Sequence, residues 1–294
     1  MSDTPLSPTV ENPAPPDAAS KTPSPSEVTK PLVIPRMSQL ATEGRVPDVL
    51  FWVGCAGSYD ARAQKVTIAF CKILNHVGID FAILGDEEAC TGDPARRAGN
   101  EFVFQMMAAQ NIEVLNGYGI KKIVATCPHC FNTLKNEYPE LGGKYEVIHH
   151  SSFLQSLIDG GQLRIVDASP RVGSEAAKIT YHDSCYIGRG NGIYEAPREV
   201  LDSLKAEIRE MNRIKQQGLC CGAGGAQMFK EDEPGDKRIN TERSEEALAT
   251  GANTIAVNCP FCLTMMTDGV TAAERQEDVM VYDLAELIVN ANGW

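Results

Sequence analysis

Residues 122–130 read Lys-Ile-Val-Ala-Thr-Cys-Pro-His-Cys, and residues 254–262 read Thr-Ile-Ala-Val-Asn-Cys-Pro-Phe-Cys. Each stretch is a short apolar run, rich in β-branched residues, followed at once by a Cys-Pro-X-Cys motif. The run predicts a buried strand, and the motif places two thiols in the loop after it. The two copies lie 132 positions apart, which indicates a chain built from two similar halves.

Strands and helices are predicted to alternate along both halves. In the first half the strand patterns lie at residues 49–53, 81–84, 122–125 and 145–148, with a long helix at 94–117. In the second half they lie at residues 178–181, 207–211, 254–257 and 279–282. This alternation favours an α/β fold of two tandem, similar lobes with parallel sheets, at residues 48–165 and 177–292. The cysteine motifs follow strands, and ligand sites gather at the carboxyl ends of such strands.

The N-terminal 36 residues differ from the rest of the chain in composition. They hold nine of the 17 prolines, with Ser, Thr, Asp and Glu between them. Such a segment buries too little apolar surface to offset the entropy lost on ordering. We therefore predict a disordered Pro-rich tail at residues 1–36, which is either a tether for a partner or a dispensable extension.

The charge and hydropathy of the chain exclude several classes of protein. The 294 residues carry a formal net charge of −12, and this argues against nucleic acid as a partner, because phosphate binding needs clustered Lys and Arg. No apolar run reaches the roughly 18 residues of a membrane span, and no apolar signal segment opens the chain. We expect a cytoplasmic protein, which could be peripheral at a membrane through a partner subunit.

The chain has ten cysteines, and their spacing repeats between the halves. Cys55 and Cys90 are 35 positions apart, as are Cys185 and Cys220, and a CxxC pair follows each second cysteine after 37 or 39 positions. Without an export signal these thiols are not expected to form disulfides. Scattered structural cysteines would not repeat in this way, so we predict two sets of metal ligands.

The number of thiols in the second set favours iron–sulfur clusters over zinc. Soft thiolates select zinc, Cu(I) or iron–sulfur clusters, and four of them suffice for a tetrahedral zinc site. The second set has five cysteines, and a fifth thiolate is of use only to a multi-iron cluster. Zinc sites also usually bring two CxxC-like knuckles, whereas each half has one. Zinc stays as the alternative.

The pattern C…CCG…CxxC resembles a known family. The stretches that carry the likeness are residues 181–185 (Tyr-His-Asp-Ser-Cys), 219–225 (Leu-Cys-Cys-Gly-Ala-Gly-Gly) and 258–262 (Asn-Cys-Pro-Phe-Cys). They resemble the cysteine-rich CCG domain found in the B- and D-type subunits of heterodisulfide reductase. Related domains occur in the iron–sulfur subunits of glycolate, lactate and glycerol-3-phosphate oxidoreductases. The resemblance covers residues 48–292.

The resemblance implies a ligand set and a cofactor for each half. In the second half it implies a noncubane [4Fe-4S] cluster held by Cys185, Cys220, Cys221, Cys259 and Cys262, with the chemistry at Cys220 and Cys221. The first half departs from the pattern, because Thr91 stands in the place of Cys221. Its ligands would be Cys55, Cys90, Cys127 and Cys130. Four thiolates suffice for a cubane cluster, and a variant cluster or none at all are the alternatives.

The resemblance also implies an oxidoreductase with partners. Many relatives carry an N-terminal ferredoxin domain, and its cysteine runs are not found in this sequence. We therefore expect an iron–sulfur electron-transfer subunit that works with a separate subunit carrying ferredoxin-type clusters, flavin or haem, within a complex that could be membrane-bound. The alternatives are a direct disulfide reductase at the C-terminal cluster and a zinc-stabilised scaffold.

Other residues received weaker interpretations. Cys71 has no counterpart in the second half and is interpreted as a buried core thiol, and His129 as a residue of the motif that does not bind metal. His149 and His150 follow a strand, where they are either polar residues at a helix start or proton donors near the clusters. His182 and Asp183 are expected to support the loop of Cys185. The segment 93–97 could place positive charge near a cluster or form surface salt bridges.

Overall fold

The computed structural model describes residues 32–165, 170–172, 175–231 and 234–294. Most of the predicted tail, residues 1–31, lies outside the described residues. Its described residues, 32–36, are exposed or half-buried, and Arg36 pairs in parallel with Ile83 just before helix α1 (Met37–Thr42). Met37 and Leu40 are buried and anchor this helix on the fold.

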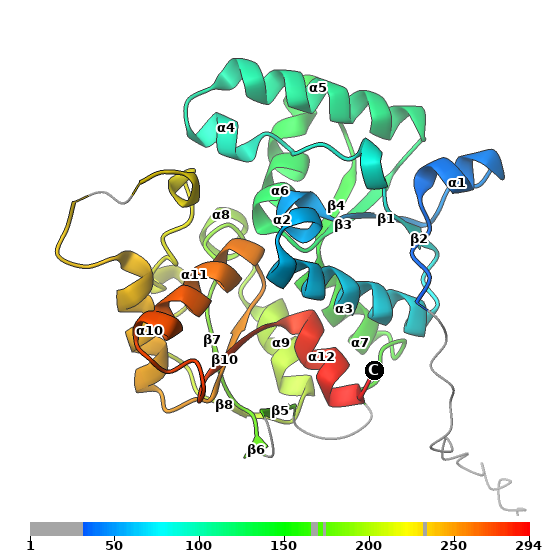
Figure 1. The fold of residues 1–294 in the computed structure, drawn as a ribbon. Coiled ribbons are helices and arrows are strands. Elements are labelled where there is room, and N and C mark those ends of the chain that lie inside the picture. The colour runs from blue at the N-terminus through cyan, green and yellow to red at the C-terminus, as the bar shows by residue number, and fades with distance from the viewer. Residues whose placement is uncertain (1–31, 166–169, 173–174, 232–233) are drawn as a thin grey trace, which may run out of the picture. The chain divides into compact units, whose positions relative to one another are not determined.

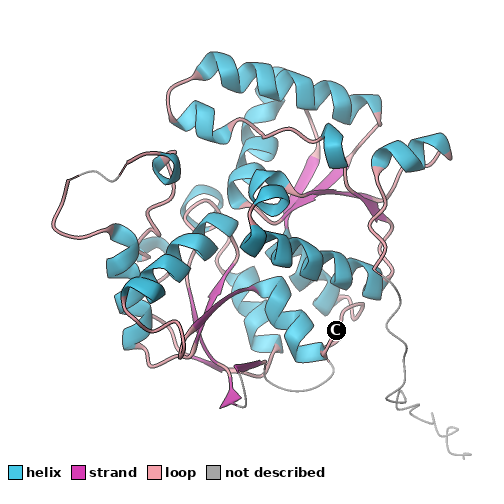
Figure 2. Ribbon diagram, viewed as in Figure 1, coloured by secondary structure: helices cyan, strands magenta, loops and turns pink. Residues whose placement is uncertain are grey.

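Two four-stranded parallel sheets form the frame of the molecule (Figure 2). The first has the order β2-β1-β3-β4, from strands β1 (Val49–Trp52), β2 (Phe81–Ala82), β3 (Lys122–Ala125) and β4 (Glu146–His149). The second has the order β10-β9-β7-β8, from β7 (Lys178–Tyr181), β8 (Glu207–Ile208), β9 (Thr254–Val257) and β10 (Met280–Asp283). Read from the other edge, the second order repeats the first. The predicted tandem α/β fold with parallel sheets is confirmed. A short antiparallel pair, β5 (Arg171–Val172) and β6 (Glu175–Ala176), lies between them in sequence.

Helices surround both sheets. In the first half they are α2 (Gly54–Tyr59), α3 (Ala61–Val77), α4 (Asp93–Arg97), α5 (Glu101–Gly117), α6 (Pro128–Asn132) and α7 (His150–Asp159). In the second half they are α8 (Gly188–Asn191), α9 (Glu195–Ser203), α10 (Ile239–Ala249), α11 (Pro260–Ala272) and α12 (Leu284–Asn292). Short helical turns occupy Gly85–Glu87, Thr133–Glu137, Tyr138–Leu141, Lys215–Gln217 and Gln227–Phe229. Within the described ranges, none of these helices has both the length and the apolar character to cross a membrane.

One predicted helix is wrong in its extent. Residues 94–117 do not form a single helix, because α4 ends before Gly99 and α5 begins after Asn100. Gly99 has a φ of 86°, in the left-handed region that ends helices. The Asn100 side chain accepts a hydrogen bond from the Val103 backbone N–H and so caps α5. The two strands expected at residues 81–84 and 207–211 are also shorter than predicted.

The two halves share one apolar core. Residues of β1 alternate between two clusters, so that Phe51 lies on the inner face of its sheet and Leu50 on the outer face. The inner cluster takes in residues from both halves, namely Phe70 and Leu74 of α3, Leu154 of α7, Leu201 of α9 and Leu287 of α12. Helix α12 packs on α3, and α7 packs on α9 (Figure 1). The terminal helix of each half therefore covers a helix of the other half.

Outer clusters complete the layers on the far face of each sheet. In the first half, α5 covers the face of Leu50 and Trp52. In the second half, α10 and α11 cover the face of Ile255 and Val257. The division into domains at residues 48–165 and 177–292 stays a prediction. The loops after the strands of both sheets carry the cysteines.

Candidate functional site

The first cysteine set gathers at the carboxyl ends of β1 and β3. Cys55 lies in the first turn of α2, directly after β1, while Cys127 precedes α6 and Cys130 lies within it. Cys90 comes from the loop after β2. All four line one small cavity, together with Thr91, Asp93, His129 and the second-half residue Phe261, among others. The structure thus brings together every residue predicted for the first site.

The second set gathers at the equivalent place in its own sheet. Cys185 follows β7, while Cys259 and Cys262 lie at the start of α11, directly after β9. The sulfurs of Cys221 and Cys262 are 3.3 Å apart. Cys185 and Cys221 lie close enough to the Cys220 thiol to lower its pKa. All five cysteines predicted for this site therefore lie together.

The same local geometry recurs at the two Gly-containing loops. The Gly92 N–H donates to the Cys90 sulfur at 3.4 Å, and the Gly222 N–H donates to the Cys220 sulfur at 3.3 Å. Thr91 Oγ1 lies 3.9 Å from the Cys130 sulfur, in the relationship that Cys221 has to Cys262. This geometry agrees with the sequence register that puts Thr91 in the place of Cys221.

Each set has an open edge and a closed one. Cys55 and Cys90 are partly exposed, whereas Cys127 and Cys130 are buried. In the second set Cys185 and Cys220 are partly exposed, and Cys221, Cys259 and Cys262 are buried. The first two cysteines of each half therefore border on solvent, while the CxxC pairs face the interior.

The closed edges of the two sets adjoin each other. Cys130 and, to a smaller degree, Cys259 lower the pKa of the Cys127 thiol, so the side chains of Cys127 and Cys259 lie close to each other across the two halves. The middle residues of the two motifs also meet, because the ring centroids of His129 and Phe261 lie 4.9 Å apart. The two CxxC motifs, 132 positions apart in sequence, thus form a direct contact between the two sites.

A buried histidine pair lies at this junction. His149 is the N-cap of α7, and its Nε2 lies 3.3 Å from the carbonyl oxygen of Thr126, the residue before Cys127. Burial holds the pKa of His149 well below its ordinary value, so the ring is neutral. His150 Nε2 lies 3.0 Å from Asp283 Oδ1, at the end of β10. The pair links the ends of β4 and β10.

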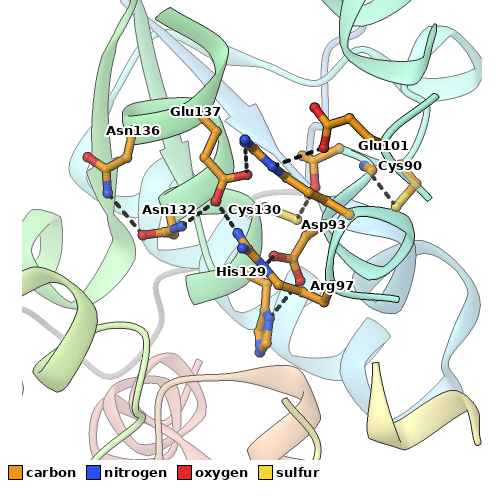
Figure 3. A network of polar contacts seen from close by, with 12 residues as sticks. Cys90, Asp93, Arg97, Glu101, His129, Cys130, Asn132, Asn136 and Glu137 are labelled. Carbon is orange, nitrogen blue, oxygen red and sulfur yellow. Dashed lines mark hydrogen bonds and ion pairs between the residues drawn. The ribbon is translucent and has the colours of Figure 1, made fainter. Parts of the chain in front are cut away.

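A polar network lies beside Cys90 and Cys130 of the first set, as Figure 3 shows. His129 Nδ1 lies 2.9 Å from Asp93 Oδ2, and Asp93 Oδ1 accepts from Arg97 Nε at 3.0 Å. Arg97 and Arg96 both pair with Glu137. The two arginines of segment 93–97 are thus neutralised by carboxylates in a partly buried network.

The surroundings of the second set contain buried polar atoms without a partner. Among the described residues these include His182 Nε2, Arg243 Nη2 and Asn258 Nδ2. A ring nitrogen of His182 lies within 4.8 Å of the sulfurs of Cys221 and Cys262, and Asn258 directly precedes Cys259. The acceptor Asn258 Oδ1 is also without a partner in the described part of the chain. Unsatisfied buried polar atoms cost about 1–3 kcal/mol each, and the three donors here suit a group that accepts hydrogen bonds.

These residues fit an iron–sulfur group. Cysteine thiolates are the ligands of iron–sulfur clusters, and N–H donors to the sulfurs are part of their protein environment. The second set offers five thiols beside free N–H donors, and the first offers four thiols beside Thr91. Cys71 lies apart from both sets in the inner core, where burial raises the pKa of its thiol to about 12.

Two buried residues near the cysteine sets were not singled out from the sequence. Arg243 of α10 is fully buried and donates from Nε to His182 Nδ1 at 3.1 Å. Trp52, at the end of β1, is fully buried with an unpartnered Nε1. The signal for Trp52 is its position, because it precedes Cys55 by three residues as His182 precedes Cys185. Arg243 gives no such signal, because it lies among the charged residues Glu242, Glu245 and Glu246 of α10.

Comparison with known proteins agrees with the geometry. The model of the cysteine-rich domain CCG matches twice, at residues 49–135 and 179–267. The chain is 46% identical over 259 residues to the "Probable iron-sulfur-binding oxidoreductase FadF" of Bacillus subtilis, covering 88% of this chain and 36% of that protein. It is 44% identical to the "EtfAB:quinone oxidoreductase" of Syntrophomonas wolfei, covering 86% of this chain and 35% of the relative.

A third relative connects the chain to heterodisulfide reductases. It is the D-type subunit of the dihydromethanophenazine:CoB--CoM heterodisulfide reductase of Methanosarcina barkeri, 35% identical over 84% of this chain and 59% of its own length. The chain thus spans about a third of the first two relatives and under two thirds of the third. The paired cysteine sets and both matches of the domain model lead to one conclusion: the chain belongs to the CCG cysteine-rich domain family.

Proposed function

We propose that the chain is the iron–sulfur electron-transfer subunit of a heterodisulfide-reductase-like oxidoreductase complex. The observation that carries this proposal is that a five-thiol set lies beside a four-thiol set, with the His129 and Phe261 rings of their CxxC motifs 4.9 Å apart. Two redox groups with adjoining ligands are suited to pass single electrons between them. The relatives support this class of function, since their names describe iron–sulfur and quinone oxidoreductases and a heterodisulfide reductase component.

The cofactors proposed are two [4Fe-4S] clusters. A noncubane cluster would be held by the second set, and a cubane or variant cluster by the four cysteines of the first. Bound there, the clusters would supply one-electron redox chemistry. The buried CxxC pairs hold the interior side of each site, and the Gly92 and Gly222 N–H groups stabilise negative charge on Cys90 and Cys220.

The partners proposed are a separate redox subunit and an electron acceptor. The partly exposed edges at Cys55 and Cys90, and at Cys185 and Cys220, give each set its own access to a partner. The donor would carry ferredoxin-type clusters, flavin or haem. The first two relatives are much longer than the region they share with this chain, so in them the cysteine-rich pair belongs to a larger polypeptide.

A second candidate is direct reduction of a small disulfide at Cys220 and Cys221. The observation that favours it is the partial exposure of Cys220 beside the buried Cys221, which gives a substrate sulfur access to one edge of the second set. Reduction of a disulfide consumes two electrons and two protons and yields two thiols. The electrons would come from the redox partner, so this candidate needs the same donor.

Metal and sulfide analysis of anaerobically purified protein tests the proposal. We expect roughly eight irons and as many sulfides per chain for two [4Fe-4S] clusters. Cys221→Ser should change the EPR signal of the second site, while Cys71→Ser, which alters a thiol outside both sets, should leave iron content and spectra unchanged. Zinc without sulfide would instead support a scaffold. Cleavage of a heterodisulfide by the isolated, reduced protein would support direct disulfide reduction over electron transfer alone.

A further inference from the structure

The side chain of Arg243 fixes the protonation of His182. Arg243 Nε donates to His182 Nδ1 at 3.1 Å, and a guanidinium has only donors. His182 Nδ1 must therefore be the accepting, unprotonated nitrogen. A neutral imidazole carries one N–H, so in this ring the hydrogen is on Nε2. Arg243 is itself anchored by its Nη1 donations to the Arg213 carbonyl and Glu246, both at 2.9 Å.

The protonated nitrogen is buried and without a partner in the part of the chain that the structure describes, and the ring lies close to the second cysteine set. His182 is 1% exposed, and its Nε2 has no hydrogen-bond partner among the described residues. A ring nitrogen of His182 lies within 4.8 Å of the sulfurs of both Cys221 and Cys262, and Nδ1 is already engaged by Arg243. A nitrogen that carries hydrogen has no lone pair for a metal ion. The group of three suggests a His–Cys–Cys metal site, but the Arg243 contact makes this histidine a donor.

The first half supplies an independent comparison at the equivalent position. Trp52 precedes Cys55 by three residues, as His182 precedes Cys185. It is fully buried, its Nε1–H is also without a partner, and it belongs to the same apolar cluster as Cys127 and Cys130. An indole nitrogen can only donate. Both halves thus place at this position a ring N–H group that can only donate a hydrogen bond.

The residue at the position of Arg243 differs between the halves in a consistent way. Asn111 precedes Cys127 by sixteen residues, and Arg243 precedes Cys259 by sixteen. Asn111 binds the Cys90 carbonyl and the Tyr138 hydroxyl, both at 3.0 Å. A tryptophan needs no neighbour to decide which atom carries its hydrogen, whereas a histidine does. The arginine occurs in the half that has the histidine.

We propose that His182, oriented by Arg243, donates its Nε2–H to sulfur at the second cysteine set and thereby raises the reduction potential of the group held there. This inference rests on the proposed function, because it takes that group to be an iron–sulfur cluster. An N–H donated to cluster sulfur stabilises the added negative charge of the reduced state. Arg243 is a positioning residue, and it acts through His182.

Redox-titrated EPR of the holoprotein tests the role of His182. The signal to follow is the one that Cys221→Ser changes. His182→Leu removes the donor. We expect the ratio of reduced to oxidised second site at a fixed potential to fall about tenfold. For a one-electron couple this is a shift of the reduction potential by about 59 mV to more negative values. His182→Gln places an amide N–H near the same position and should restore most of the potential. Trp52→Phe is the matched control, expected to move only the signal of the first site.

Pulsed EPR of wild-type protein with 15N-labelled histidine gives a test that needs no variant. We expect a weak nitrogen coupling, transmitted through the N–H···S hydrogen bond. A strong coupling typical of direct coordination would overturn the proposal, as would an unchanged potential in iron-loaded His182→Leu. Absence of iron and sulfide from the wild type would overturn the proposed function itself, and so is distinguishable from failure of the His182 role alone.

Discussion

Thr91 and Cys130 repeat, with a hydroxyl in place of a thiol, the contact that Cys221 makes with Cys262. The Thr91 oxygen lies 3.9 Å from the Cys130 sulfur, and the corresponding sulfurs in the second half are 3.3 Å apart. Thr91 is 1% exposed, so its side chain occupies a position inside the site. The first set thus has four thiols instead of five because of this one side chain.

Thr91→Cys should therefore give the first site the full set of five thiols. We expect the EPR signal of the first site to become similar to that of the second, with no loss of iron. Thr91→Ser, which keeps the hydroxyl, is the control and should leave the signal unchanged. If Thr91→Cys behaves like Thr91→Ser, the difference between the sites does not depend on this side chain.

Gly92 is expected to be essential for the loop that carries Cys90. Its φ is 86°, and an added Cβ would lie 2.9 Å from the Phe104 ring. Gly92→Ala should combine strain of about 1–2 kcal/mol with this clash and reduce the iron bound at the first site. Gly99 has the same φ of 86°, but an added Cβ there would meet nothing within 4 Å. Gly99→Ala should lose some stability and keep its iron, and equal iron loss in both variants would contradict the steric argument.

The ion pair of Arg62 and Glu286 should contribute to the packing of the two halves. The Arg62 guanidinium contacts both carboxylate oxygens, at 2.6 and 2.9 Å, and also donates to the Val281 carbonyl at 2.7 Å. Arg62→Ala leaves the largely buried Glu286 unpaired, and we expect the free energy of unfolding to fall by about 2 kcal/mol. The exposed pair Arg275–Asp278 is the control, where Arg275→Ala should cost at most about 1 kcal/mol. Denaturant titrations under anaerobic conditions measure both, and equal losses would refute the role of the pair.

His149 should make the stability of the protein depend on pH. Burial lowers its pKa in the folded state, so the unfolded chain binds more protons below the ordinary pKa of about 6.5. The contribution of His149 is therefore present above that pH and lost as the pH falls. Between pH 7.5 and 5.5 the loss should be about 1.4 kcal/mol.

The variant that isolates this effect is His149→Asn. Asparagine can still cap α7 but does not titrate, so the difference in unfolding free energy between wild type and variant should shrink at acidic pH. A difference that stays constant from pH 7.5 to 5.5 would show that His149 is not responsible for the acid sensitivity.

Local patterns in the sequence were sufficient for much of the fold. The apolar runs at residues 122–125 and 254–257 are strands β3 and β9 with the predicted bounds, and each CxxC motif follows its strand directly. The equal spacings predicted that the nine cysteines form two sets. The structure brings each set together, because the carboxyl ends of parallel strands meet at one edge of a sheet. The break at Gly99 was missed, although a Gly-Asn pair is a recognised helix-ending signal.

Local sequence patterns did not predict contacts between residues that lie far apart in the chain. The apolar faces of α3 and α12 indicate burial but do not say which surface covers them, so the exchange of helices between the halves was not predicted. The contact of Cys127 with Cys259 follows from that same arrangement. Arg243 was missed for a related reason, because its partner His182 lies sixty-one positions away.

The exchange of helices has a consequence for how the protein is made. A nascent chain that ends near residue 165 has all four cysteines of its first set, yet α3 still lacks the Leu287 and Ile288 side chains that belong to its core. Those side chains lie in α12, in the second half of the chain. The scaffold of the first site is therefore complete only after α12 has been synthesised. A cluster proposed for the first site should then be inserted only once both halves are present.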